Sequence, residues 1–165
     1  MNGKIVFALI SVLIVSAGLS FFFLKRGQPS SEFRNFELES GVFGAAQAEK
    51  KKIYIGKNEF TVYIADTLEK QSRGLMFVKE LAQNEGMMFL FQRSFRPIFY
   101  NKNTLIPLDL LWINKGVVKE ISFLPAVRTI NLTFLSPREN VDAVIELGAG
   151  SVQKYEIKAG DRVTS

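Results

Sequence analysis

The sequence contains no cysteine and no histidine among its 165 residues. The lack of cysteine excludes disulfide bonds and thiol nucleophiles, and the lack of both residue types excludes zinc sites built from their side chains. A serine nucleophile activated by histidine is excluded for the same reason. The sequence predicts no cofactor.

The rest of the composition favours a folded protein with a mild basic excess. Hydrophobic residues make up 47% of the chain, so a packed core can form and disorder throughout is excluded. The formal net charge of +5 suits an anionic membrane surface or a polyanion, although such an excess is more often a solvated face. The basic residues are dispersed, so we expect no nucleic-acid partner.

A long apolar run dominates the N-terminus. Residues 5–24 carry no charge and are flanked by Lys4 on one side and by Lys25 and Arg26 on the other. A helix of this length spans about 30 Å, the thickness of a bilayer's hydrocarbon core. We expect residues 1–26 to form a transmembrane anchor or uncleaved signal. A cleaved signal peptide is the alternative, but the A-x-A-like site at 46–48 lies far beyond the run.

Residues 27–50 mix Gly, Pro, Ser and Glu with scattered Phe and show no sustained period. This composition is typical of a linker. The sequence thus predicts a single-pass membrane protein, held in the bilayer by residues 5–24, whose domain lies outside the cytoplasm. The positive-inside rule is nearly balanced here and leans slightly towards the opposite orientation.

From residue 51 to 165 the pattern is one of short strands separated by turns. Turn residues predict two hairpins, around "GKNE" at 56–59 and around "NKG" at 114–116. Asp66 or Thr67 can cap a short helix that Gly74 ends. The apolar runs at 86–91 and 108–113 predict buried, central strands.

These elements predict a mainly β domain. We expect an antiparallel β-sandwich or partly closed barrel of about eight short strands with one or two short helices, preceded by the transmembrane helix. Eight phenylalanines and Trp112 would fill its interior.

Several segments together carry a resemblance to a known family. They are "RGLMFVKEL" at 73–81, "EGMMFLF" at 85–91, "FYNKNTLIPLDLLWIN" at 99–114, "VIELGAG" at 144–150 and "AGDRV" at 159–163. Over residues 52–164 the chain resembles the family known as domain of unknown function 192. The resemblance implies a compact, mainly β fold and attachment to, or export across, a membrane, and it implies no established activity. The chain departs from the family pattern at Tyr100 and Asn101, where Trp and Met are usual.

Seven residues of these segments are candidates for a binding or structural role: Arg73, Tyr100, Lys102, Asn103, Thr104, Asp109 and Glu146. In one interpretation Asn103 and Thr104 satisfy the backbone of a tight turn, and Asp109 pairs with Lys102 or Arg73. In the other, the seven residues line a pocket for a polar ligand.

The functional hypothesis is a membrane-anchored module of the cell envelope that binds a small polar ligand, a glycan or a protein partner. The alternative is an envelope hydrolase in which Asp109 and Glu146 act as a carboxylate pair, which requires a separation of roughly 5 to 10 Å. A binding module is favoured over an enzyme. No metal site is predicted, because no Asp/Asn-rich loop accompanies the two carboxylates.

Overall fold

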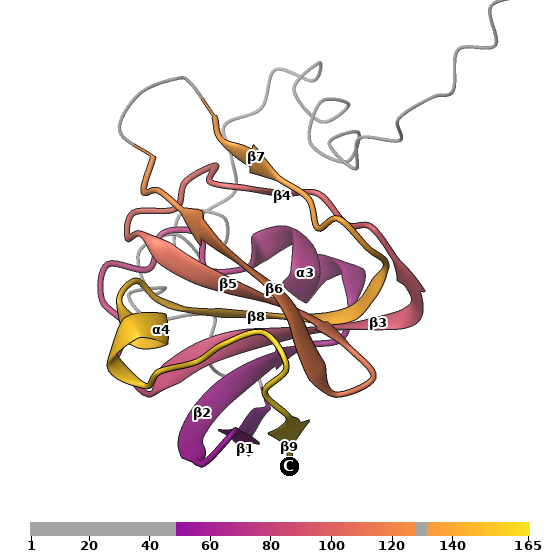
Figure 1. Ribbon diagram of the computed structural model, residues 1–165. Helices are drawn as coiled ribbons and strands as arrows, with labels where there is room; N and C mark the ends of the chain where they lie inside the picture. The colour runs from indigo at the N-terminus through magenta and orange to yellow at the C-terminus, as the bar shows by residue number, and fades with distance from the viewer. Residues whose placement is uncertain (1–48, 128–131) are drawn as a thin grey trace, which may run out of the picture.

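The computed structural model describes residues 49–127 and 132–165, which form nine strands and two short helices (Figure 1). Their order is β1 (Lys50–Ile55), β2 (Asn58–Ala65), α3 (Leu68–Arg73), β3 (Glu85–Phe95), β4 (Phe99–Tyr100), β5 (Leu108–Asn114), β6 (Val117–Leu124), β7 (Phe134–Leu135), β8 (Val141–Gly148), α4 (Ser151–Lys154) and β9 (Val163–Thr164).

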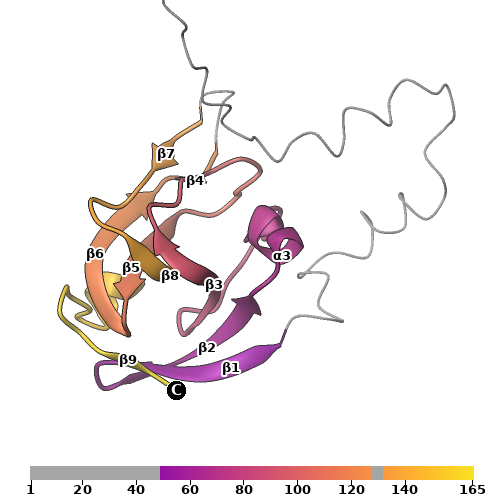
Figure 2. The same ribbon diagram turned by 90° about the vertical axis from the view of Figure 1, so that its right-hand side faces the viewer.

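Seven strands make one sheet in the order β6-β5-β8-β3-β2-β1-β9, and β4 and β7 make a separate two-stranded sheet. The large sheet curls into a half-barrel (Figure 2), so the barrel alternative was the better one. The pairing is antiparallel except between β2 and β3, which run parallel. That exception follows from the connection: a parallel pair needs a crossover, and α3 lies in it.

The C-terminal segment links the two sides of the curled sheet. Gly160 N–H donates to Val118 O at 2.8 Å, and Val163 N–H donates to Gly116 O at 2.8 Å. The same segment continues as β9, which pairs with β1. A few backbone hydrogen bonds therefore connect β6 to β1 and partly close the barrel.

Both predicted hairpins form, and their turn residues explain why. β5 and β6 are joined by Lys115 and Gly116, which have φ values of 52° and 67°. Two positive φ values in a two-residue loop are the mark of a type I′ turn, whose twist matches that of the strands. Gly56 supplies the positive φ in the turn between β1 and β2. The helix prediction is also confirmed, because Thr67 accepts from Lys70 N–H at 3.3 Å and Gly74 is the C-cap.

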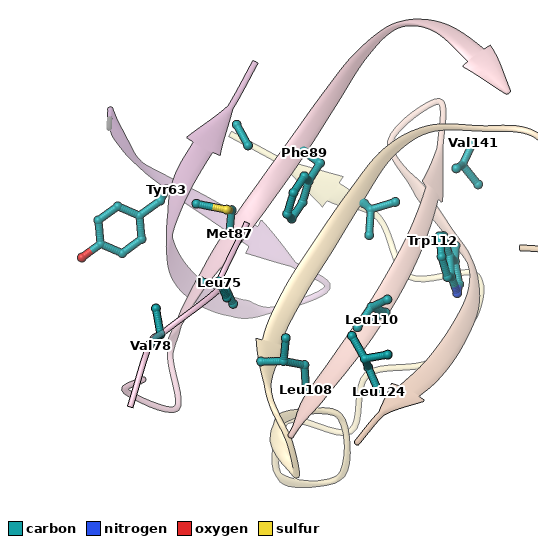
Figure 3. Close-up of a cluster of buried hydrophobic side chains, with 12 residues drawn as sticks. Tyr63, Leu75, Val78, Met87, Phe89, Leu108, Leu110, Trp112, Leu124 and Val141 are labelled. Carbon is teal, nitrogen blue, oxygen red and sulfur yellow. The ribbon is translucent and has the colours of Figure 1, made fainter. Parts of the chain in front are cut away.

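The sheet carries a separate apolar cluster on each face. One, drawn in Figure 3, contains Leu75, Met87, Phe89, Leu110 and Trp112 among others. The other is made by the alternate side chains of the same strands, and residues of the C-terminal segment pack against it. The runs at 86–91 and 108–113 lie in β3 and β5, which are both interior strands, as predicted.

The prediction that the phenylalanines fill the interior is only partly correct. Phe60 and Phe89 are buried, and Phe91 and Phe99 are partly buried. The other four are exposed on the surface: Phe77, Phe95, Phe123 and Phe134. The apolar run at 86–91 also leaves the core sooner than expected, because Leu90 is exposed and β3 continues outward to Phe95.

The predicted anchor at 1–26 and most of the predicted linker at 27–50 lie outside the described residues. Within residues 49–127 and 132–165, no helix is long and apolar enough to span a bilayer.

Candidate functional site

The polar block between β4 and β5 is a tight turn. Thr104 N–H donates to Asn101 O at 3.1 Å, and Asn103 has a φ of 54°. A single positive φ at the third position is typical of a type II turn, and asparagine tolerates it. The geometry thus gives Asn103 and Thr104 the turn-forming role of the structural interpretation.

The turn also joins neighbouring segments. Asn101 is buried, its side-chain amide donates to Pro125 O at 2.9 Å, and its side-chain oxygen accepts from Thr133 N–H at 2.9 Å. The Asn103 carbonyl accepts from Phe77 N–H at 2.8 Å. The turn is therefore held to the residue after β6, to the residue before β7 and to the loop after α3. Asn101 was not among the predicted site residues, although it stands where the family pattern has an apolar residue.

Tyr100 and Lys102 alternate with the buried Asn101 and are exposed. The Tyr100 ring stacks on Phe134 with centroids 5.9 Å apart. The described contacts of Lys102 are made by its backbone, whose carbonyl accepts from the Thr104 hydroxyl at 3.3 Å. These two side chains face outward rather than lining a pocket with the buried members of the set.

The observed partner of Asp109 is not Lys102, which was one of the two residues predicted to pair with it. Its carboxylate accepts from Val152 N–H at 3.0 Å, so it fastens the first turn of α4 to β5. The Ser151 hydroxyl donates to Gly148 O at 2.6 Å in the same place. Because Asp109 is only 8% exposed, its oxygen would otherwise lack a partner, and the observed bond supports a structural role.

Asp109 and Glu146 do not form the predicted carboxylate pair. In the β5–β8 ladder Asp109 is opposite Leu147, while Glu146 is opposite Leu110. Directly opposed residues share a face and adjacent residues point to opposite faces. The two carboxyl groups therefore lie on different faces of the sheet, and no single substrate can sit between them. The geometry contradicts the hydrolase based on this pair.

Glu146 points into the apolar cluster of Figure 3. Its cross-strand neighbours are Met87 on β3 and Leu110 on β5. It is 5% exposed, and its Oε2 atom has no hydrogen-bond partner among the described residues. Burial raises the pKa of the Glu146 carboxyl to about 8, because an apolar surrounding penalises the charged form. The group is thus protonated at neutral pH.

The segment after α3 covers this carboxyl. A Cβ atom on Gly74 would lie 3.9 Å from Glu146 Oε2 and 3.4 Å from the Phe89 ring. The next residues, Leu75 and Val78, are buried in the same cluster. Gly74 directly follows Arg73, one of the predicted site residues, so this end of α3 lies close to Glu146. Gly74 itself was read only as a helix end, and nothing in the sequence indicated its contact with the carboxyl.

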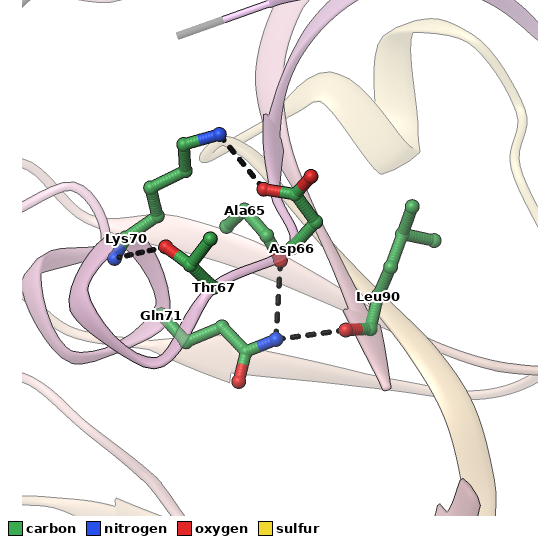
Figure 4. Close-up of polar contacts among 6 residues, drawn as sticks. All are labelled: Ala65, Asp66, Thr67, Lys70, Gln71 and Leu90. Atoms are coloured by element: carbon green, nitrogen blue, oxygen red, sulfur yellow. Dashed lines mark hydrogen bonds and ion pairs between the residues drawn. The ribbon is translucent and has the colours of Figure 1, made fainter. Parts of the chain in front are cut away.

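Helix α3 is held on the sheet at the start of this cover (Figure 4). The Gln71 amide donates to Leu90 O at 2.7 Å and to Ala65 O at 3.2 Å. Lys70 forms an ion pair with Asp66 at 2.7 Å. The end of the cover is held by the bond between Phe77 and Asn103. Segment 74–78 therefore lies between two attachment points, and its first residue, Gly74, is next to the Glu146 carboxyl.

The candidate site is consequently Glu146 together with segment 74–78, which contacts the carboxyl at Gly74 and is bonded to the 101–104 turn through Phe77. A protonated carboxyl offers one O–H donor and retains an acceptor oxygen, which suits an uncharged polar group. No cluster of three or more acidic side chains that could hold a metal ion occurs in the part of the chain that the structure describes.

Comparison with known proteins covers the whole domain that contains this site. The family model DUF192, described as "Uncharacterized ACR", matches residues 51–165. The chain belongs to the DUF192 family. The predicted resemblance is thereby confirmed over nearly the same residues.

Two solved structures share the DUF192 fold with this chain. A protein of unknown function from Novosphingobium aromaticivorans is 29% identical, with a TM-score of 0.66, and the match covers 75% of this chain and 91% of that chain. A Sinorhizobium meliloti protein described as a candidate transcription regulator is 28% identical, with a TM-score of 0.65 and coverages of 71% and 94%. No curated protein matches this chain.

The coverage of these relatives has a practical consequence. Both consist almost entirely of the matched domain and were obtained as crystal structures. We therefore expect a fragment spanning residues 49–165 to fold, and we use it as the sample for solution experiments.

Proposed function

We propose that this protein is a membrane-anchored binding module of the cell envelope that takes up a small, uncharged polar ligand at Glu146. One observation carries the proposal: a fully buried carboxyl whose Oε2 atom has no hydrogen-bond partner among the described residues. An unsatisfied buried polar atom costs about 1 to 3 kcal/mol, and such a group in a native structure calls for a reason. A ligand that supplies the missing bond is that reason.

The chemistry of the ligand follows from the state of the carboxyl. Because the pKa of Glu146 is raised to about 8, the group is neutral at pH 7 and pairs with a hydroxyl, amide or carbonyl rather than with an ion. Leu75, Phe89 and Leu110 around it would hold the apolar part of the ligand. Glu146 lies beneath segment 74–78, so the ligand enters when this segment moves aside.

Anchoring through residues 5–24 and an extracytoplasmic domain complete the proposal. The length of the uncharged run supports the anchor, and the export or membrane attachment that the family resemblance implies supports the location of the domain. Cell fractionation of the full-length protein checks the first point: it should remain in the membrane after a carbonate wash. Protease added to spheroplasts should digest the domain. A soluble product beginning near Glu49, or a domain protected until lysis, contradicts the respective point.

Ligand binding is tested by thermal shift on the 49–165 fragment at pH 6.5 with a panel of sugars, amides and hydroxy compounds. At least one class should raise the melting temperature of the wild type and fail to do so for Glu146→Leu. Met87→Leu is the matched control, since Met87 is the cross-strand neighbour of Glu146 and its exchange leaves the carboxyl in place. A panel with no effect, or one that stabilises Glu146→Leu equally, contradicts the proposal.

A further inference from the structure

The small sheet formed by β4 and β7 has one face that nothing in the described part of the chain covers. Phe99 and Leu135 point inward and pack against the core cluster. The alternate residues point outward, and we call them the ribbon face: Ile98, Tyr100, Leu132 and Phe134. They are 65%, 38%, 37% and 63% exposed, respectively.

The ribbon face is continuous rather than scattered. Tyr100 and Phe134 are directly opposite each other in the β4–β7 ladder and their rings stack. Ile98 lies just before β4 and Leu132 just before β7, and both side chains are exposed next to this pair. The ribbon stands at the end of the domain opposite β9 and the C-terminus (Figures 1 and 2). Contiguous exposed apolar residues of this kind mark an interaction surface.

The stretch of sequence that contains β4 carries only basic charges. From Gly86 to Leu108 the sequence holds Arg93, Arg96 and Lys102 and no acidic residue. Lys102 is exposed and follows Tyr100 on the outward side. Arg96 Nε donates to Pro137 O at 2.8 Å, which places its cationic group at the base of the ribbon. Arg138, by contrast, is partly balanced by Glu120 at 3.9 Å.

We propose that the ribbon face docks on the surface of an anionic lipid bilayer. Tyrosine and branched apolar side chains insert at the headgroup boundary, and adjacent Lys and Arg attract anionic lipid. The proposal goes beyond ligand binding at Glu146, and in the cell it rests on the proposed anchor for proximity. The proposed anchor would keep the domain close to the bilayer, so a weakly binding face would meet the bilayer repeatedly.

The test uses the 49–165 fragment, so that its result does not depend on the anchor. The fragment is sedimented with vesicles of phosphatidylglycerol and phosphatidylcholine, and with vesicles of phosphatidylcholine alone. We expect binding to the anionic vesicles, weakened by salt because the surface potential is screened. Phe134→Ser should weaken it about tenfold, and Lys102→Gln about fivefold.

The chain offers a matched control at the other end of the domain. Tyr54 on β1 is 43% exposed, close to the 38% of Tyr100. Tyr100→Ser should weaken vesicle binding, whereas Tyr54→Ser should leave it unchanged, with circular dichroism used to show that each variant folds. The proposal is overturned if the fragment binds neither kind of vesicle, as expected for a face that takes a protein partner. It is also overturned if the two tyrosine variants bind equally well.

Discussion

Two buried carboxyl groups lie on neighbouring strands of the same sheet and differ in their hydrogen bonding. Asp109 on β5 faces the C-terminal segment and accepts a backbone hydrogen bond from α4. Glu146 on β8 faces the other apolar cluster, where its Oε2 atom has no partner among the described residues. Their exposures, 8% and 5%, are nearly the same. Burial alone therefore does not distinguish a structural carboxyl from a candidate binding group, and the presence of a partner does.

The difference also separates what each group contributes to stability. A carboxyl with a hydrogen-bond partner helps to hold two segments together, and losing it leaves a buried N–H unsatisfied. A carboxyl without one adds a cost that grows when it must ionise. Function at the expense of stability is expected at binding sites, which is why Glu146 rather than Asp109 is the centre of the proposal.

The largest predicted effect is a pH dependence of stability caused by Glu146. Its pKa is raised from 4.5 to about 8 by burial, so the folded state binds more protons than the unfolded state between these values. Stability should therefore fall as pH rises through this window, by up to about 1.4 kcal/mol per pH unit. Urea unfolding of the 49–165 fragment measures this, with Glu146→Gln as the reference.

The amide of Glu146→Gln does not titrate. The unfolding free energy of the wild type minus that of this variant should therefore fall steadily from pH 5 to pH 8. Any constant cost of the buried amide cancels in the slope. Glu59 and Asp66 have pKa values lowered by Lys52 and Lys70, and both variants share them. Parallel curves for wild type and Glu146→Gln would show that Glu146 titrates normally.

Removal of the Asp109 carboxylate is the next effect in size. Asp109→Ala should lower the free energy of unfolding by about 1 to 3 kcal/mol, because the Val152 N–H is left without its partner. Asp109→Asn keeps an acceptor oxygen and should cost less. Hydrogen exchange of the Val152 amide should accelerate in Asp109→Ala. Should the urea midpoints of both variants match the wild type, the structural role of Asp109 is wrong.

A change in the cover over Glu146 should act on both stability and protonation. Gly74 has a φ of 49°, which is unfavourable for an L-residue by about 1 to 2 kcal/mol, and an added Cβ meets Phe89. Gly74→Ala should destabilise by this amount and shift the pKa of Glu146 down by exposing the carboxyl. Gly160→Ala is the control: its φ is 99° but its Cβ meets nothing within 4 Å. An equal shift in the pKa of Glu146 in both variants would show that segment 74–78 does not shield the carboxyl.

The smallest predicted effect is that of the Tyr100 hydroxyl. Tyr100→Phe should change the free energy of unfolding by less than about 0.5 kcal/mol, because the ring keeps its stacking on Phe134. A clear loss of stability would mean that the hydroxyl, rather than the ring, matters at this exposed position.

Local features of the fold were the most predictable from sequence. Gly116 and Thr67 encode a turn and a helix cap within a few residues, and these predictions are confirmed. The partners of buried polar groups depend on strand register, which a single sequence does not reveal. Asp109 was therefore given Lys102 or Arg73 as a partner. The alternative hydrolase hypothesis paired Asp109 with Glu146, although the register puts them on opposite faces of the sheet. Hydrophobicity alone likewise could not distinguish Phe134, which lies on an exposed face, from Phe89, which lies in the core.

The protonation of Glu146 tests the central claim most directly. Carbon-13 NMR of the side-chain carboxyl, followed from pH 4 to pH 10 in the 49–165 fragment and assigned with Glu146→Gln, reports its pKa without unfolding the protein. The account predicts a midpoint near 8. A midpoint near 4.5, the ordinary value for a glutamate, would contradict it, because the carboxyl would then be charged at neutral pH and could not be the neutral, unpaired group at the site.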